Sequence, residues 1–186
     1  MIHTTAKKYG SGFTLVELLV AIAVFIVVMT ISLGSILSIM DASRKAKNLK
    51  TMMTNLNFSI DVMAREIKFG KKYYCGIDVT NPHIATQNCS SGGTSITFTT
   101  STGVDTIYTL SSGQIQKSIN HGGTYIGVTS PEVTIQDLKF FVLGSTFADT
   151  IQPKVLVLIR GYAGSKPTTQ SSFVLQTTLS QRELDR

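Results

Sequence analysis

The sequence lacks the residue clusters on which most enzymes and metal sites depend. It has three histidines, His3, His83 and His121, which lie far apart in the chain. Its two cysteines, Cys75 and Cys89, do not have the spacing of a zinc site. The 11 acidic residues form no local catalytic pair, and there is no phosphate-binding glycine loop or Gly-x-Ser-x-Gly motif. These absences predict a protein that is not an enzyme and that uses no metal or cofactor.

Charge is missing from one long stretch. No charged residue occurs from Leu18 to Met40, a run of 23 residues. At about 1.5 Å per residue, a helix of this length crosses the roughly 30 Å hydrocarbon core of a bilayer. A secretory signal peptide has a shorter apolar core of about 7–15 residues, followed by a small-residue cleavage site that this run lacks. The run therefore predicts a membrane-spanning helix.

The net charge of +6 is unevenly distributed. Residues 73–186 contain seven basic and seven acidic residues, so this segment is neutral and gives no support for nucleic acid as a partner. Basic residues precede the apolar run at Lys7 and Lys8, and others follow it, so the charge rule does not decide the orientation in the membrane. The basic excess after the run consists of Arg44, Lys45, Lys47, Lys50, Arg65, Lys68, Lys71 and Lys72.

A short basic leader ends in Gly12 and is followed by Phe13, Thr14, Leu15 and Glu17, and then by the apolar run. This arrangement resembles the N-terminus of type IV prepilins and of the pseudopilins of type II secretion, in which cleavage residue, carboxylate and apolar helix occur in this order. The resemblance covers the first quarter of the chain. More loosely, the order of a long helix, a cysteine loop and strands is similar to the larger minor pilins and the J-type minor pseudopilins.

The resemblance implies that prepilin peptidase cuts between Gly12 and Phe13 and that Phe13 is then N-methylated. Glu17, the fifth residue of the mature chain, would neutralise the amino terminus of a neighbouring subunit in a filament. From the residue alone, Glu17 also has a simpler interpretation, as a carboxylate that stays at the membrane interface.

The resemblance also implies the partners and the location of the protein. The partners are prepilin peptidase, other pilin or pseudopilin subunits, an inner-membrane assembly platform, and membrane lipid before assembly. The location is the bacterial inner membrane, crossed once with the C-terminal domain outside the cytoplasm, and then a pilus or pseudopilus.

The helical pattern continues beyond Met40 as one apolar stripe with three- and four-residue spacing from Leu49 to Ile67, and Gly70 is its predicted stop. We expect the stripe beyond Leu49 to pack under the C-terminal domain; the alternative is packing on other subunits. The predicted divisions are a leader at 1–12, a transmembrane or filament-core helix at 13–40, its amphipathic continuation at 41–72, and a β-rich globular domain at 73–186.

Short alternating runs separated by turn residues predict an antiparallel sheet in the C-terminal part. The fold class is therefore α+β and pilin-like, with the long helix on a β-sheet. Residues 73–95 are predicted as a loop, with a turn or link at 90–93. The predicted strands are 95–99, 105–110, 114–119, 133–142, 154–162 and 172–179.

Cys75 and Cys89 are predicted to form a disulfide across this loop. A bridge that closes 15 residues stabilises a fold by about 3 kcal/mol, and such bridges persist outside the cytosol. Two free thiols are the alternative, because spacing alone does not establish the geometry.

Three classes of function fit these features. The first is a structural subunit, a minor pilin or pseudopilin; the second is a binding or adhesion module at a filament tip; the third is a single-span membrane protein that does not polymerise. Cleavage at Gly12 and a requirement for Glu17 separate the first two from the third. Salt-dependent DNA retention by residues 73–186 would separate the second from the first.

Gly12→Val is expected to block cleavage, because it enlarges the residue at the predicted scissile bond. Mass spectrometry of the mature wild-type N-terminus should find methylated Phe13, whereas the variant should keep its leader. A wild-type chain that retains Met1 in cells with an active peptidase would contradict the predicted processing.

Overall fold

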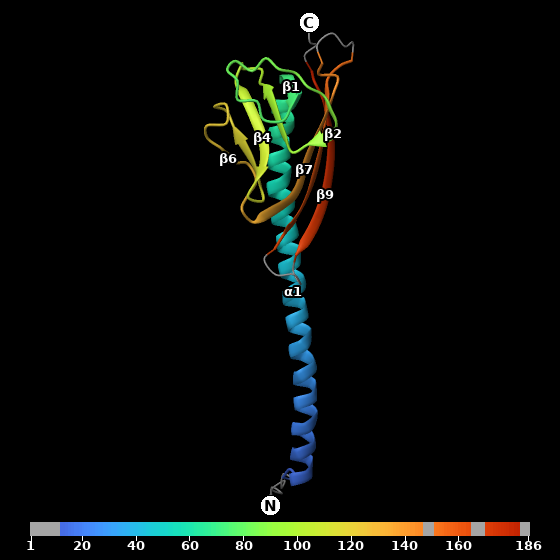
Figure 1. The fold of residues 1–186 in the computed structure, drawn as a ribbon. Helices are drawn as coiled ribbons and strands as arrows, with labels where there is room; N and C mark the ends of the chain where they lie inside the picture. The colour runs from blue at the N-terminus through green and yellow to red at the C-terminus, as the bar shows by residue number, and fades with distance from the viewer. Residues whose placement is uncertain (1–11, 147–150, 165–169, 183–186) are drawn as a thin grey trace, which may run out of the picture. The chain divides into compact units, whose positions relative to one another are not determined.

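The computed structural model describes residues 12–146, 151–164 and 170–182. In this part of the chain a single α-helix, α1 (Leu15–Lys68), is followed by β-strands (Figure 1). The chain divides into two compact units, Met1–Ser43 and Arg44–Arg186. The strands, all in the second unit, are β1 (Lys71–Cys75), β2 (Cys89–Gly93), β3 (Ser95–Thr99), β4 (Asp105–Ser111), β5 (Gln114–Ser118), β6 (Ile126–Gly127), β7 (Val133–Leu143), β8 (Lys154–Ala163) and β9 (Ser171–Ser180).

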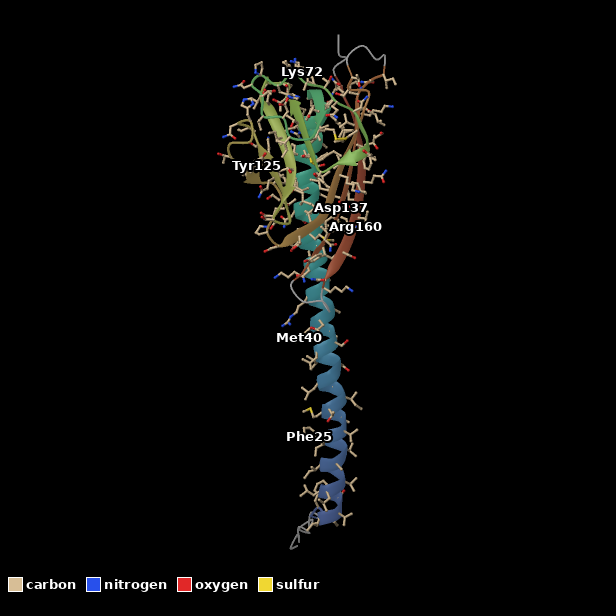
Figure 2. All side chains as sticks on the ribbon, viewed as in Figure 1. Phe25, Met40, Lys72, Tyr125, Asp137 and Arg160 are labelled. Carbon is tan, nitrogen blue, oxygen red and sulfur yellow. A yellow bond between two sulfur atoms is a disulfide. The ribbon has the colours of Figure 1, made fainter. Side chains whose placement is uncertain are left out.

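The part of α1 in the first unit is apolar around its whole circumference. Every residue from Phe13 to Ser43 is exposed, and apolar side chains project on all sides (Figure 2). The most apolar 18-residue window of α1 has a mean hydropathy of 2.7, which makes the helix apolar enough and long enough to cross a membrane.

Three hydroxyl groups in this part of the helix are satisfied by the helix itself. Thr30, Ser32 and Ser35 each donate a hydrogen bond to the carbonyl oxygen four residues earlier, over 2.8, 2.8 and 3.1 Å. A polar group in hydrocarbon needs such an internal partner, since no water is available to it. These three residues therefore do not oppose an apolar environment.

From Arg44 onward α1 buries one face in a core that it shares with the strands. The stripe predicted to pack under the C-terminal domain does so, whereas Leu49 and Met53, near its start, stay 42% and 45% exposed. The three- and four-residue spacing places the buried side chains on one side of the helix. The buried apolar residues of this face are Met52, Leu56, Ile60, Met63 and Ile67.

The strands form two antiparallel sheets, whereas the sequence predicts one. The first has the order β1-β3-β4-β5-β6, and the second has the order β2-β7-β8-β9. Buried residues of both sheets and of α1 belong to one continuous core. The sheets also meet at the main chain, where the amide of Ile135 in β7 donates to the carbonyl of Gly113 in the β4–β5 turn, over 2.8 Å.

Six predicted strands are present as β3, β4, β5, β7, β8 and β9, and three others were not predicted. The prediction of a turn at 90–93 is wrong, because these residues belong to β2. There Cys89 pairs with Val142 and Gly93 with Phe140, through an irregular register. Small residues suit this strand, since Gly92 has a φ of 82° and a side chain there would meet the ring of Phe141.

Gly70 follows the end of α1, but for a different reason than the usual one. Its φ is not in the left-handed region that a helix-ending glycine commonly adopts. Instead Gly70 is buried, and a side-chain carbon placed on it would lie 2.6 Å from the ring of Phe98 in β3. The glycine therefore allows the first turn of chain after the helix to pack against the sheet.

A polar contact joins α1 to the first sheet. The Tyr108 hydroxyl of β4 donates to Glu66 of α1 over 2.7 Å, and the Lys117 ammonium of β5 lies 2.5 Å from the other carboxylate oxygen. Burial, together with the acceptor carboxylate of Glu66, raises the pKa of Tyr108 far above its ordinary value. The hydroxyl thus remains a donor at any physiological pH. Hydrogen bonds to charged groups contribute about 1.5–3 kcal/mol, so this contact adds to the apolar packing of the helix.

Leu56→Ala is expected to lower the free energy of unfolding by about 2–5 kcal/mol, because Leu56 is 1% exposed and its removal leaves a cavity. Phe58→Ala is the matched control on the same helix: Phe58 is 70% exposed, so its loss should change stability by less than about 0.5 kcal/mol. Urea unfolding of the oxidised full-length chain in detergent, followed by tyrosine near-ultraviolet circular dichroism, measures both. Equal losses in the two variants would contradict the observed packing of α1.

Candidate processing and assembly site

The predicted processing residues lie at the start of the long helix. Gly12, Phe13 and Thr14 precede the first helical residue, Leu15. Gly12 is exposed, with no atom within 4 Å of the position a side chain would occupy, and Phe13 is 82% exposed. No described residue from Gly12 onward therefore blocks the approach of another protein to the Gly12–Phe13 peptide bond. The leader residues Lys7 and Lys8 lie outside the described residues.

Thr14 caps the helix that follows. Its hydroxyl oxygen accepts a hydrogen bond from the amide of Glu17 over 3.3 Å, and its carbonyl oxygen accepts one from the amide of Leu18 over 3.2 Å. The first bond satisfies the Glu17 amide, which has no main-chain partner within the helix, and the second is the first main-chain bond of the helix. This role of Thr14 was not predicted, although Thr-x-x-Glu is the spacing of a capping box and signals a helix start.

Glu17 lies in the first turn of α1, three residues after its cap. The exposed amides of a first turn favour a negative charge there. In residues 12–146, 151–164 and 170–182 no basic side chain forms an ion pair with Glu17. Beyond it the helix carries no charge until Asp41. The carboxylate is therefore the lone charge at one end of an apolar surface, and it is available to a group from another molecule.

The two cysteines lie in the other unit and are brought together there. Cys75 ends β1 and Cys89 begins β2, and their sulfur atoms form a disulfide. Because β1 is an edge of the first sheet and β2 an edge of the second, the bond links the two sheets. Gly93 packs directly against the bond, where a larger residue would collide with the Cys75 sulfur.

Inside the disulfide-closed loop, His83 forms a buried polar contact that the sequence did not reveal. Its ring is 1% exposed, with Nδ1 2.6 Å from Asp78 Oδ2 and Nε2 2.7 Å from the Lys72 carbonyl oxygen. Its main-chain amide donates to Asp105 Oδ2 over 2.9 Å. His83 thus holds the loop to β1 and β4. Among the described residues, no group of three His, Cys, Asp or Glu side chains is arranged to hold a metal.

The environment of Asp78 stabilises the charged form of its carboxyl group. Burial opposes the charge, but the hydrogen bonds from the Thr80 amide and from His83 outweigh it and hold the pKa of the Asp78 carboxyl below its ordinary value. The hydrogen bonds that lower this pKa also hold the loop together, so the shift reflects a structural role of Asp78. Nothing else in this cluster points to catalysis.

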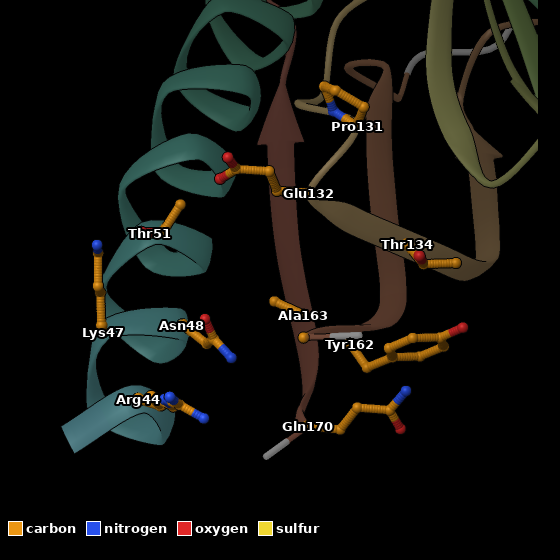
Figure 3. Close-up of a pocket in the computed structure, with 11 residues that line it drawn as sticks. Arg44, Lys47, Asn48, Thr51, Pro131, Glu132, Thr134, Tyr162, Ala163 and Gln170 are labelled. Atoms are coloured by element: carbon orange, nitrogen blue, oxygen red, sulfur yellow. The ribbon is translucent and has the colours of Figure 1, made fainter. Parts of the chain in front are cut away.

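A groove of about 710 Å³ lies between α1 and the second sheet (Figure 3). Arg44 and Lys47 project from the helix, and Glu132, Tyr162 and Gln170 come from the strand side. Charges of both signs line it, and its lining contains neither histidine nor cysteine.

Comparison with known proteins finds a match in the N-terminal region of the chain. A family model described as "Prokaryotic N-terminal methylation motif" matches residues 7–33, a range that includes Gly12, Phe13 and Glu17. No curated protein and no solved structure matches the chain. The chain therefore carries a prepilin-type N-terminal methylation motif, and its architecture is pilin-like: one long N-terminal helix packed against antiparallel sheets.

The motif has two consequences at this level. It implies processing by prepilin peptidase, and together with the apolar helix it is consistent with a membrane-anchored precursor. Proteins of the pilin-like class are typically structural subunits and not enzymes.

Asp78→Asn is expected to destabilise the protein by about 1–3 kcal/mol at neutral pH, because it leaves the buried His83 without its charged partner. Since the folded-state pKa of Asp78 lies below the ordinary value of 3.8, its contribution is present above that pH and is lost as the pH falls through the folded-state pKa. The difference between variant and wild type should therefore shrink below pH 3.8. Urea unfolding at several pH values measures it, with Asp61→Asn at an exposed helix position as the control. A difference that persists unchanged into acid would contradict this role of Asp78.

Proposed function

We propose that this protein is a structural subunit, a minor pilin or pseudopilin, of a type IV pilus or a type II secretion filament. The observation that carries the proposal is the prepilin-type motif at the start of a helix that is exposed and apolar on all sides from Leu18 to Met40. A helix that is apolar all round is stable in lipid or among other apolar helices, and not in water. A filament core built of such helices provides the second environment.

The proposed life of the chain has three stages. It is made as a precursor that spans the bacterial inner membrane once, with its N-terminus in the cytoplasm and its C-terminal domain outside. Prepilin peptidase removes residues 1–12, and Phe13 becomes the methylated N-terminus. The assembly platform then transfers the subunit from the membrane into the filament. The Cys75–Cys89 disulfide supports an outside location, because such bonds persist outside the cytosol.

Each segment has a part in this scheme. Residues 13–40 form the membrane span and then the filament core. The helix continues to Lys68, four residues short of the predicted boundary at 72, and the strands of the globular domain begin with β1 at Lys71. The burial of Met52, Leu56 and Ile67 supports this assignment, because one face of the continuing helix is already covered by the globular domain.

Glu17 is proposed to pair with the amino terminus of a neighbouring subunit. After cleavage the charged nitrogen of Phe13 enters a low-dielectric core, where an unpaired charge costs several kcal/mol. Four residues along a helix correspond to about 6 Å, so the amine and the carboxylate of one chain lie about one turn apart. A small axial step between subunits would bring one subunit's carboxylate level with the amine of the next. The Thr14 cap supports this role, because it holds the first turn and therefore the direction of Glu17.

Glu17→Ala is expected to leave membrane insertion intact while filament incorporation falls by about tenfold or more, the factor that ~1.4 kcal/mol of lost pairing produces. Glu17→Asp keeps the charge with a shorter reach and should give a smaller loss. The measurement is the amount of chain in sheared filaments relative to the amount in the membrane fraction.

Two controls make this experiment decisive. N-terminal mass spectrometry shows that each variant is still cleaved and methylated, so that a processing defect is not read as an assembly defect. The corresponding carboxylate variant of a shaft subunit of the same system shows the size of effect that the filament produces. A correctly processed Glu17→Ala chain that enters filaments as well as wild type would show that the pairing role is wrong.

A further inference from the structure

The two sheets have four edges, and three of them are protected against pairing with another strand. The strand β6 has 2 residues, and β1 and β2 have 5 each. Both β1 and β2 pair irregularly with their neighbours; β1 carries Lys71 and Lys72, and β2 begins at the disulfide. Short length, irregular register and lysine are the devices by which natural sheets avoid edge-to-edge association.

The fourth edge, β9, has none of these devices. It is 10 residues long and pairs with β8 from Ser171 to Ser180 without a bulge. Its sequence contains no charged residue, no proline and no glycine. In the described part of the chain no strand lies on its other side. Val174, on the outer face of the strand, is 65% exposed. A long, regular, uncharged edge of this kind presents a row of unpaired main-chain groups.

We propose that the free edge of β9 binds an extended segment of a different subunit of the same filament, which adds a strand to the β2-β7-β8-β9 sheet. This inference rests on the proposed function. Main-chain hydrogen bonds along the edge supply the attraction, and contacts with exposed side chains such as Val174 supply selectivity. Because β9 is uncharged, the partner segment gains nothing from charge and is itself expected to be uncharged where it pairs.

The direction of β9 argues against a second copy of this chain as the partner. Gln170, before β9, lines the groove that also contains Arg44, and the amide of Arg182, after β9, donates to the carbonyl of Lys68 over 2.8 Å. Thus β9 starts near Arg44 and ends near Lys68, so it runs in the same direction as the part of α1 from Arg44 to Lys68. Two-fold antiparallel pairing of β9 with itself would reverse this part of α1 in one of the two copies.

Such a reversal conflicts with a shared membrane. In two copies anchored in one membrane through the apolar run, Arg44 follows Met40 by only four residues, so chain connectivity keeps the Arg44 end of both copies near the bilayer. The other three edges that a second copy offers are the protected ones. The remaining occupant is a strand of another subunit.

Two adjacent threonines allow a matched test. Thr177 lies on the same face of β9 as the buried Phe173 and Leu179 and is itself partly buried, whereas Thr178 is exposed on the opposite face. A lysine at position 177 can extend past an open edge into water, but a docked strand would cover that path and bury the charge. A lysine at position 178 stays in water in either case.

The test uses the full-length chain in cells with the complete filament system. Thr177→Lys is expected to reduce recovery in sheared filaments by about tenfold, because burying an unpaired charge is costly. Thr178→Lys should stay within about twofold of wild type, since its charge remains solvated. Cleavage at Gly12 and oxidation of Cys75 and Cys89 are measured in parallel to show that both variants are processed and folded.

A second measurement does not depend on the folding of the lysine variants. A photo-activated cross-linking residue at position 174 should form an adduct with another protein that carries a prepilin-type motif, and peptide mapping should place the adduct in an extended segment. The same residue at Ile126, which is 64% exposed on the protected edge β6, is the control. Adducts of equal yield at the two positions, or adducts at position 174 with a second copy of this chain alone, would overturn the inference.

The outcomes separate this inference from the proposed function. If Thr177→Lys is processed, oxidised and incorporated like wild type, the inference about β9 is wrong and the filament role stands. If the wild-type chain itself is processed but absent from filaments, the filament role is wrong and the inference that rests on it is wrong as well.

Discussion

The structure depends on one constraint: the helix from Leu18 to Met40 must not be left in water. Each large apolar side chain there gains about 1.5–3 kcal/mol when it is removed from water, and none of them is buried by the chain itself. Three hydroxyls of this segment, on Thr30, Ser32 and Ser35, are bonded to carbonyl oxygens of the helix, and Thr14 caps the turn before it. Lipid and a bundle of like helices are the two environments that meet this constraint, which is why a membrane precursor and a filament subunit can share one helix.

The same helix has a different task after Arg44. There the apolar residues are confined to one face, and Met52, Leu56 and Met63 fill the space between helix and sheets. Glu66 adds a charged contact to Tyr108 and Lys117 at the far end of this face. The apolar surface of α1 thus changes from all-round to one-sided. The all-round part needs an apolar environment from outside the chain, and the one-sided part completes the globular core.

The sequence predicted well those features that depend on neighbouring residues. The helix was expected to run to Gly70 and ends at Lys68, because its spacing is local information. The alternation that marks β7 and β8 is equally local. The strands β1, β2 and β6 were missed. In β1 two tyrosines favour a strand but stand in a segment rich in turn residues, and β6 has only 2 residues. In β2 serine and glycine have little preference for strands and form one here because the partner strand β7 is present. For the same reason a loop and one sheet were predicted where two sheets occur.

In the candidate site, too, local features were predicted and contacts between distant residues were not. Gly12, Phe13 and Glu17 were recognisable because their chemistry lies within a few consecutive residues. Thr14 was within reach of the sequence, through the Thr-x-x-Glu spacing. The contact of His83 with Asp78 and the Lys72 carbonyl was not, because it joins residues separated by up to 11 positions in a segment without periodic pattern. Such contacts become visible only when the path of the loop is known.

The methylation motif covers only residues 7–33, so the surface by which the proposed subunit would select its partner is sought in the rest of the chain. The neutral segment 73–186 provides little electrostatic steering toward a partner. In the proposed membrane-anchored precursor, the shared bilayer would replace such steering, because it raises the effective concentration of partners anchored in it. Under that condition a surface does not need charge to find its partner; it needs geometry that few other surfaces satisfy. An open strand edge has such geometry, since its main-chain groups accept only an extended segment in register, and among the described strands β9 is the edge without a protective device.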